Sequence, residues 1–102
     1  MSNGGWERDP GELVRVKTTV VNLKQEPYDV YIGRPSKWGN RFIIGKHGDR
    51  GGVVAKYREW IRQQPDLLSH LADLRGKRLG CYCKPEPCHG DVLAEMADKT
   101  PP

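Results

Sequence analysis

All three cysteines of this 102-residue chain lie within eight residues, in the segment GCYCKPEPCHGD. Cysteines this close together cannot cross-link distant parts of the chain, and an odd number of them cannot all pair. The fold must therefore be held together by an apolar core rather than by a disulfide framework. A chain of this length has room for one domain with one such core.

The pattern of apolar residues predicts short strands and helices in the order β-β-α-α-β-α. Segments rich in Val and other β-branched residues indicate strands, and apolar residues three and four apart indicate helices. The expected strands cover residues 13–23, 29–33 and 77–83, and the expected helices cover residues 53–62, 66–74 and the segment from 88 onwards. This order predicts a small α/β or α+β domain with a short mixed sheet covered by helices.

The two ends of the chain are polar, which predicts a flexible arm at residues 1–12 and a flexible tail at 99–102 around a single globular domain at 13–98. No apolar run approaches the roughly 18–20 residues of a membrane span, and the first residues lack the apolar core of a signal peptide. We therefore expect a cytoplasmic protein with reduced thiols. The net charge of +4 favours anionic partners such as nucleotides, nucleic acids or acidic proteins.

The cysteine-rich segment has three interpretations, of which the first is a metal site. Cys81, Cys83, Cys88 and His89 would hold one ion, and zinc is the leading candidate because three cysteines and a histidine are a recognised zinc ligand set. An iron–sulfur cluster on the three cysteines is a less favoured variant. The C-x-C-x4-C-H spacing differs from the usual C-x2-C pairs, and the adjacent Cys88 and His89 would both have to reach the same ion.

The second interpretation is a reactive thiol, and the third is a buried cysteine without chemistry. Cys88 is expected at the start of a helix, where the helix dipole and free N–H groups lower the pKa of a thiol. His89 or His47 would then act as its base, and Asp91 would orient the imidazole or simply favour the helix start. Cysteine is also a common small buried residue, so all three interpretations stay open.

A second segment, YIGRPSKWGNR, places cationic side chains around Trp38 in a loop that follows an expected strand. Such loops bind ligands in open α/β sheets, cationic groups suit phosphate, and an indole can stack on a base. With the helix start at Gly90 as a second anion site, the predicted ligand-binding residues are Gly33, Arg34, Pro35, Ser36, Lys37, Trp38, Gly39, Asn40 and Gly90. The alternative is a structural loop whose Trp38 fills the edge of the core, and the loop matches no established phosphate-binding motif.

Together, the two segments resemble the signatures of a family of small bacterial and phage domains of unknown function. Members of that family look like Y-[IV]-G-R-P-[ST]-K-W-G-N-P-F, followed after a helix by L-R-G-K-x-L-x-C-[WY]-C-x-P-x-x-C-H-[AG]-D-V-L, and the similarity covers residues 20–97. Here Arg41 stands where the family usually has Pro, and Tyr82 replaces the commoner Trp. The resemblance implies that residues 33–42 and 81–91 form one site, and it implies no activity.

These observations predict a domain whose RPSKWGN loop and CHGD helix start jointly bind a phosphate-bearing ligand, with a nucleotide as the leading candidate. One alternative is a zinc-stabilised module that binds nucleic acid. Another is an inhibitor or adaptor of a host protein that has no small-molecule ligand. The sequence leaves open whether the protein is an enzyme, and Cys88, His89 and Asp91 are the candidate catalytic residues.

Overall fold

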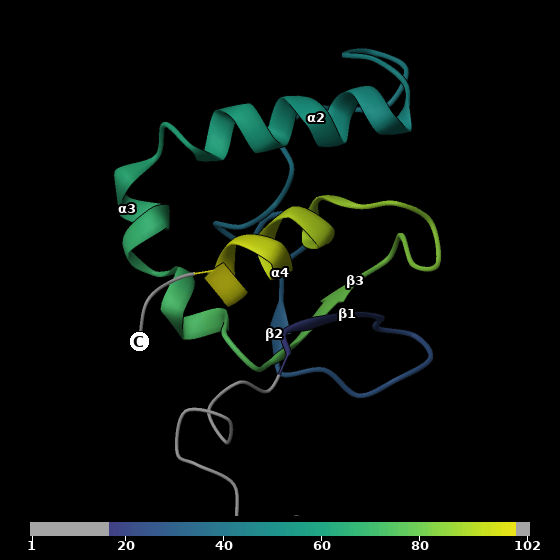
Figure 1. Ribbon diagram of the computed structural model, residues 1–102. Helices are drawn as coiled ribbons and strands as arrows, with labels where there is room; N and C mark the ends of the chain where they lie inside the picture. The colour runs from purple at the N-terminus through teal and green to yellow at the C-terminus, as the bar shows by residue number, and fades with distance from the viewer. Residues whose placement is uncertain (1–16, 100–102) are drawn as a thin grey trace, which may run out of the picture.

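A computed structural model describes residues 17–99 of the chain (Figure 1). The elements, in chain order, are β1 (Thr19–Asn22), β2 (Val30–Tyr31), α2 (Arg50–Ile61), α3 (Pro65–Ser69), the 3-10 helix η2 (Leu71–Leu74), β3 (Arg78–Cys81) and α4 (His89–Lys99). This is the predicted α+β class, with a short sheet and helices in nearly the predicted order. The predicted arm at 1–12 lies outside the described residues, as do positions 100–102 of the predicted tail. None of the helices described is long and apolar enough to cross a membrane.

The sheet has the strand order β1-β3-β2, and both neighbouring pairs are parallel. The prediction of a mixed sheet is therefore wrong. The last strand in sequence, β3, lies in the centre of the sheet. The helical segment between β2 and β3 returns the chain to the edge at which β2 begins, so that β3 runs parallel to β2. As a consequence, the carboxyl ends of all three strands meet at one edge, and the segments that follow β2 and β3 leave the sheet side by side.

The single helix predicted over residues 66–74 is divided into α3 and the 3-10 helix η2. Two side chains compete for one carbonyl at the division, because Ser69 Oγ and His70 Nδ1 both lie 2.7 Å from the carbonyl oxygen of Asp66. The backbone N–H of His70 donates to Leu67 instead, three residues back. Local hydrogen bonds of this kind are a common reason for a helix to end early.

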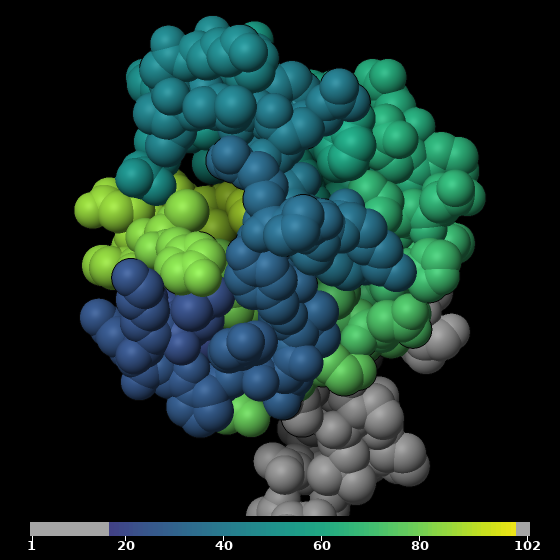
Figure 2. Space-filling view, turned by 180° about the vertical axis from the view of Figure 1, so that it is seen from behind, coloured from purple at the N-terminus to yellow at the C-terminus, as the bar shows by residue number. Residues whose placement is uncertain are grey.

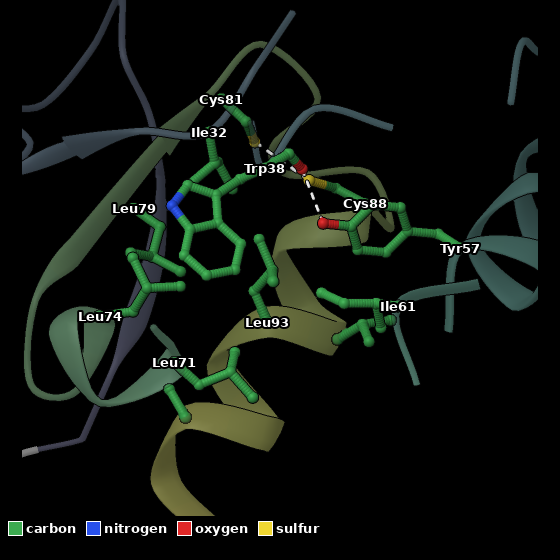
Figure 3. Close-up of a cluster of buried hydrophobic side chains, with 12 residues drawn as sticks. Ile32, Trp38, Tyr57, Ile61, Leu71, Leu74, Leu79, Cys81, Cys88 and Leu93 are labelled. Atoms are coloured by element: carbon green, nitrogen blue, oxygen red, sulfur yellow. Dashed lines mark hydrogen bonds between the residues drawn. The ribbon is translucent and has the colours of Figure 1, made fainter. Parts of the chain in front are cut away.

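Helix α4 lies between α2 and the sheet, so its apolar side chains complete the core on both sides (Figure 1). Leu93 of α4 is fully buried, and the indole of Trp38 is buried with it (Figure 3). The hydroxyl of Tyr57, on α2, donates to the backbone carbonyl of Trp38 over 2.7 Å. The core thus extends from the sheet into the loop that follows β2.

The first turn of α4 rests directly on the sheet because residue 90 is a glycine. A Cβ at this position would lie 2.7 Å from Cδ1 of Ile32 and 2.9 Å from Cγ1 of Val20, closer than such atoms approach in proteins. Gly90 therefore brings the start of α4 against the sheet. The close approach also places Cys88, just before the helix, next to the end of β3.

Candidate functional site

The site lies at the carboxyl edge of the sheet, where the chain leaves β2 and β3. A pocket of about 320 Å³ opens there, between residues 33–42, the loop that follows β3 and the start of α2. In Figure 2 it is the hollow between the teal segment that leads into α2 and the yellow-green loop after β3. The loops predicted to share a site therefore face each other across one pocket.

Only part of the predicted ligand-binding set lines this pocket. Gly33, Arg34 and Asn40 do, together with six residues of the cysteine-rich segment. The remaining predicted ligand-binding residues are not on its wall, namely Pro35, Ser36, Lys37, Trp38, Gly39 and Gly90. Trp38 is 3% exposed, so its indole has no free face on which a base could stack. Trp38 therefore fills the edge of the core, as the alternative interpretation of this loop predicted.

Gly90 was predicted to offer its backbone N–H to an anion, and the structure gives that N–H another partner. It donates to Sγ of Cys88 over 3.1 Å, and the residue is buried. The start of α4 is therefore occupied by a sulfur atom of the chain itself. A phosphate bound at this helix start would have to displace that contact.

Hydrogen bonds within the loop hold residues 33–40 in place. The hydroxyl of Tyr31 donates to the carbonyl of Arg34 over 2.6 Å. Nδ2 of Asn40 donates to the carbonyl of Val53, and its Oδ1 accepts the N–H of Phe42. Both ends of the Asn40 amide are thus bound to the backbone, so this residue shapes the pocket rather than offering a free polar group to a ligand.

Two arginines give the pocket a positive wall. Arg34 is exposed and reaches the pocket from the loop after β2, and Arg50 reaches it from the first residue of α2. Nη1 of Arg50 lies 3.4 Å from the carbonyl of Pro87, and neither guanidinium is paired with a carboxylate among residues 17–99. No acidic residue lines the pocket within that range. The charges on this wall are available to an anion.

The three thiols also line the pocket, where β3 ends and α4 begins. Cys81 ends β3, Cys83 lies in the following loop and Cys88 precedes α4, yet their sulfur atoms all lie within 4.8 Å of one another. Sγ of Cys81 and Sγ of Cys88 are 3.2 Å apart, and both residues are buried (Figure 3). His89, predicted as the fourth metal ligand, does not belong to this group of mutually close ligand atoms. The described residues therefore offer three sulfurs at this point.

Hydrogen bonds shift the pKa values of the two buried thiols, Cys81 and Cys88, in opposite directions. The hydrogen bond with the thiol of Cys88 lowers the pKa of Cys81 to about 6, and the backbone N–H groups of Cys83 and Lys84 act in the same direction. The same interaction with Cys81, together with burial, raises the pKa of Cys88 above its usual range. These contacts favour negative charge on Cys81 rather than on Cys88, and the reactive Cys88 thiol stays a prediction. Its single N–H donor, from Gly90, is outweighed by those at Cys81.

A hydrogen bond to the sheet fixes the orientation of the His89 imidazole. Its Nε2 lies 2.7 Å from the carbonyl oxygen of Ile32, and since a carbonyl only accepts, this nitrogen carries the proton. Its Nδ1, with a lone pair, lies 3.8 Å from Sγ of Cys88. Burial lowers the pKa of His89, so the ring is neutral at pH 7. The imidazole is thus held in one tautomer between the sheet and the thiol.

Asp91 stabilises the start of α4 instead of orienting the imidazole. Its Oδ2 accepts the backbone N–H of Cys88 over 3.1 Å, while Sγ of Cys88 accepts the N–H of Gly90. These reciprocal bonds form a capping box with cysteine in the place of serine or threonine. Its Oδ1 lies 2.6 Å from Nζ of Lys84. The other candidate base, His47, accepts the N–H of Ile43 within its own turn.

The comparisons with known proteins agree with the similarity found in the two segments. Residues 14–99 match the family described as a domain of unknown function, DUF4326. The chain belongs to this family. An uncharacterised 12.4 kDa protein of Enterobacteria phage T4, from the nrdA-td intergenic region, is 40% identical over 94 residues, which cover 87% of this chain and 82% of the phage protein. No solved structure matches the chain.

In this DUF4326 domain, sequence reasoning missed Arg50 and Tyr31 as pocket residues, and it included Phe42 and Tyr82 only within the ranges 33–42 and 81–91. Tyr31, Phe42 and Tyr82 all line the pocket, and Tyr82 is 59% exposed. The spacing of these residues carries no signal of a shared site, because each belongs to a different segment. Arg50 follows Asp49, which caps α2 through the N–H of Gly52. The place of Arg50 at a helix start was the only available hint.

Proposed function

We propose that this DUF4326 domain binds a phosphate-bearing small molecule of the nucleotide class in the pocket. The observation that carries the proposal is the pair Arg34 and Arg50 on a pocket whose described walls contain no carboxylate. Guanidinium groups bind phosphate through paired, charge-assisted hydrogen bonds. An arginine with no acidic partner is available for such a ligand.

The aromatic side chains and the volume of the pocket favour a nucleotide over inorganic phosphate alone. The rings of Tyr31 and Tyr82 meet edge to face, with centroids 6.4 Å apart. Tyr82 is 59% exposed and can stack on a base if the side chain of Lys24, whose Nζ lies 5.6 Å from the centre of the ring, moves aside. The pocket of about 320 Å³ lies at the lower end of the range of roughly 300–1,000 Å³ typical of small-molecule sites. One nucleotide fits this size better than a longer chain.

The proposal also includes a cofactor, bound by the three thiols that line the same pocket. Sulfur ligands are preferred by thiophilic ions, and zinc is the ion that we propose for them. The binding of a phosphate group by Arg34 and Arg50 does not depend on that ion. The two parts of the proposal can therefore be tested separately.

The first test is calorimetric titration of the reduced, metal-free protein with AMP, GMP, CMP, UMP and inorganic phosphate. We expect at least one nucleotide to bind, and phosphate to bind more weakly. Each charge-assisted hydrogen bond contributes roughly 1.5–3 kcal/mol, so Arg34→Ala should weaken binding by about tenfold or more. Lys37→Ala is the matched control, because Lys37 lies in the same loop but not on the pocket wall, and it should bind as the wild type does.

Two results would contradict this proposal. One is the absence of binding by every nucleotide at millimolar concentration, and the other is equal weakening by Arg34→Ala and Lys37→Ala. A single-stranded oligonucleotide that binds far more tightly than any mononucleotide, with an affinity that falls steeply with salt, would instead favour the nucleic-acid-binding alternative. A stable complex with a host protein and no small-molecule ligand would favour the adaptor alternative.

A further inference from the structure

We infer that Cys81, Cys83 and Cys88 bind one zinc ion through their three sulfur atoms and leave its fourth coordination position open to the pocket. The inference deepens the proposed function and rests on it for the use of the pocket as a ligand site. It assigns the coordinating atoms, and it places the ion on the wall of the same pocket that Arg34 and Arg50 line.

The spacing of the sulfurs suits a tetrahedral ion. Zinc–sulfur bonds of about 2.3 Å place the sulfurs of a tetrahedral site about 3.8 Å apart. The three sulfurs here lie within 4.8 Å of one another, and those of Cys81 and Cys88 are 3.2 Å apart. Small rotations about the side-chain bonds would equalise these separations. All three cysteines are free of disulfide bonds, so no bond has to break before an ion can enter.

The surroundings of the sulfurs stabilise negative charge, which a purely structural cysteine does not require. The backbone N–H groups of Cys83 and Lys84 donate to Sγ of Cys81, and the N–H of Gly90 donates to Sγ of Cys88. Three thiolates on a divalent ion leave one excess negative charge. The ammonium of Lys84, the N-terminus of α4 and these N–H groups lie where they can balance it.

The fourth position faces the pocket because no described protein group is placed to fill it. The unprotonated Nδ1 of His89 lies 3.8 Å from Sγ of Cys88, yet His89 falls outside the group of ligand atoms that all lie within 4.8 Å of one another. All three cysteines line the pocket. Closed sites with four protein ligands are typical of structural zinc, whereas three protein ligands and an open position are typical of sites that bind a further group. That group would be water or a phosphate oxygen.

The experiment is a zinc titration of the full, reduced chain against a chromophoric chelator, without any phosphate ligand. We expect one zinc ion per chain. Cys83→Ser should weaken binding by more than the roughly 10–100-fold that is typical of losing a residue outside the coordination sphere. Glu86→Ala is the matched control, since it changes an exposed residue between Cys83 and Cys88 that does not line the pocket, and it should bind zinc as the wild type does. Equal affinity of Cys83→Ser and the wild type would overturn the three-sulfur site.

Cobalt in place of zinc tests the open position in the wild-type protein, and thus does not depend on the folding of any variant. The visible absorption of the cobalt-loaded protein should be that of a tetrahedral ion, and it should shift when imidazole is added. A spectrum that imidazole leaves unchanged would mean that a protein group fills the fourth position, and would overturn that part of the inference. Failure of zinc to bind leaves nucleotide binding by the metal-free protein untouched, so the two failures are distinguishable.

Discussion

The two loops that form opposite walls of the pocket are held in place by different forces. The loop at residues 33–40 is anchored by apolar burial, through Trp38, and by the backbone-bound amide of Asn40. The loop at 82–88 is anchored by hydrogen bonds to sulfur and by the contact of Lys84 with the carboxylate of Asp91. The first wall is therefore anchored by a buried aromatic ring, while the second combines the buried side chain of Cys88 with polar contacts whose strength depends on charge. The difference predicts that substitutions in the first wall cost more stability than those in the second, where we propose the ion site.

The largest effect is expected for Trp38→Ala, which removes the anchor of the first wall. Truncation of a buried Trp costs about 3–5 kcal/mol of unfolding free energy, a large part of the roughly 5–15 kcal/mol of a typical domain. Urea denaturation followed by circular dichroism measures it. Lys37→Ala, at the exposed neighbour, should stay within about 0.5 kcal/mol of the wild type. If both variants unfold at the same urea concentration, the first wall is not part of the core.

Periodicity and β-branched runs were enough to predict the class of fold and the position of most elements. They could not predict that the sheet is parallel throughout, because the pairing partners of a strand depend on the path of the chain between them. The same patterns could not predict that the helix expected at residues 66–74 is divided into α3 and η2. The division depends on Ser69 and His70 competing for one carbonyl, and an apolar pattern that continues to Leu74 conceals such a break.

The sequence also indicated the two segments of the candidate site, but not which side of each segment faces the pocket. A loop without periodicity gives no rule for the direction of its side chains. Arg34 lines the pocket and Trp38 enters the core, although the sequence indicated both equally as ligand-binding residues. The charge distribution between Cys81 and Cys88 was equally hidden, because it depends on N–H groups that converge only in the folded chain.

A smaller loss is expected where the second wall joins the core. Gly90→Ala would place a methyl group 2.7 Å from Cδ1 of Ile32, and overpacking of this kind typically costs about 1–3 kcal/mol. Thermal denaturation of the variant should show a lower midpoint than the wild type. Gly45→Ala is an unsuitable control because its φ is 90°, whereas Gly51→Ala has open space on an exposed helix turn. A Gly90→Ala variant that is as stable as Gly51→Ala would show that α4 does not need this close approach.

The polar anchor of the second wall should contribute less still. Asp91→Ala removes the acceptor of the Cys88 N–H and the partner of Lys84. Loss of a helix cap typically costs about 1 kcal/mol, and the partly exposed ion pair adds little to this. Glu86→Ala, in the same loop and exposed, is the control and should unfold like the wild type. A loss as large as that of Trp38→Ala would contradict the contrast between the two walls.

The smallest effect on the metal-free protein is expected for Cys83→Ser. Cys83 is partly exposed at the edge of the core, and substitutions of this kind usually change stability by less than about 0.5 kcal/mol. The variant should differ from the wild type only when zinc is present. At a free zinc concentration of about 100 times the dissociation constant, zinc should raise the unfolding free energy of the wild type by about 2.7 kcal/mol. At the same concentration, it should raise that of Cys83→Ser only slightly. Denaturation curves with and without zinc measure both differences. A metal-free Cys83→Ser protein that is strongly destabilised would show that the thiol belongs to the core, like Trp38 on the first wall, and would remove the distinction between the two walls.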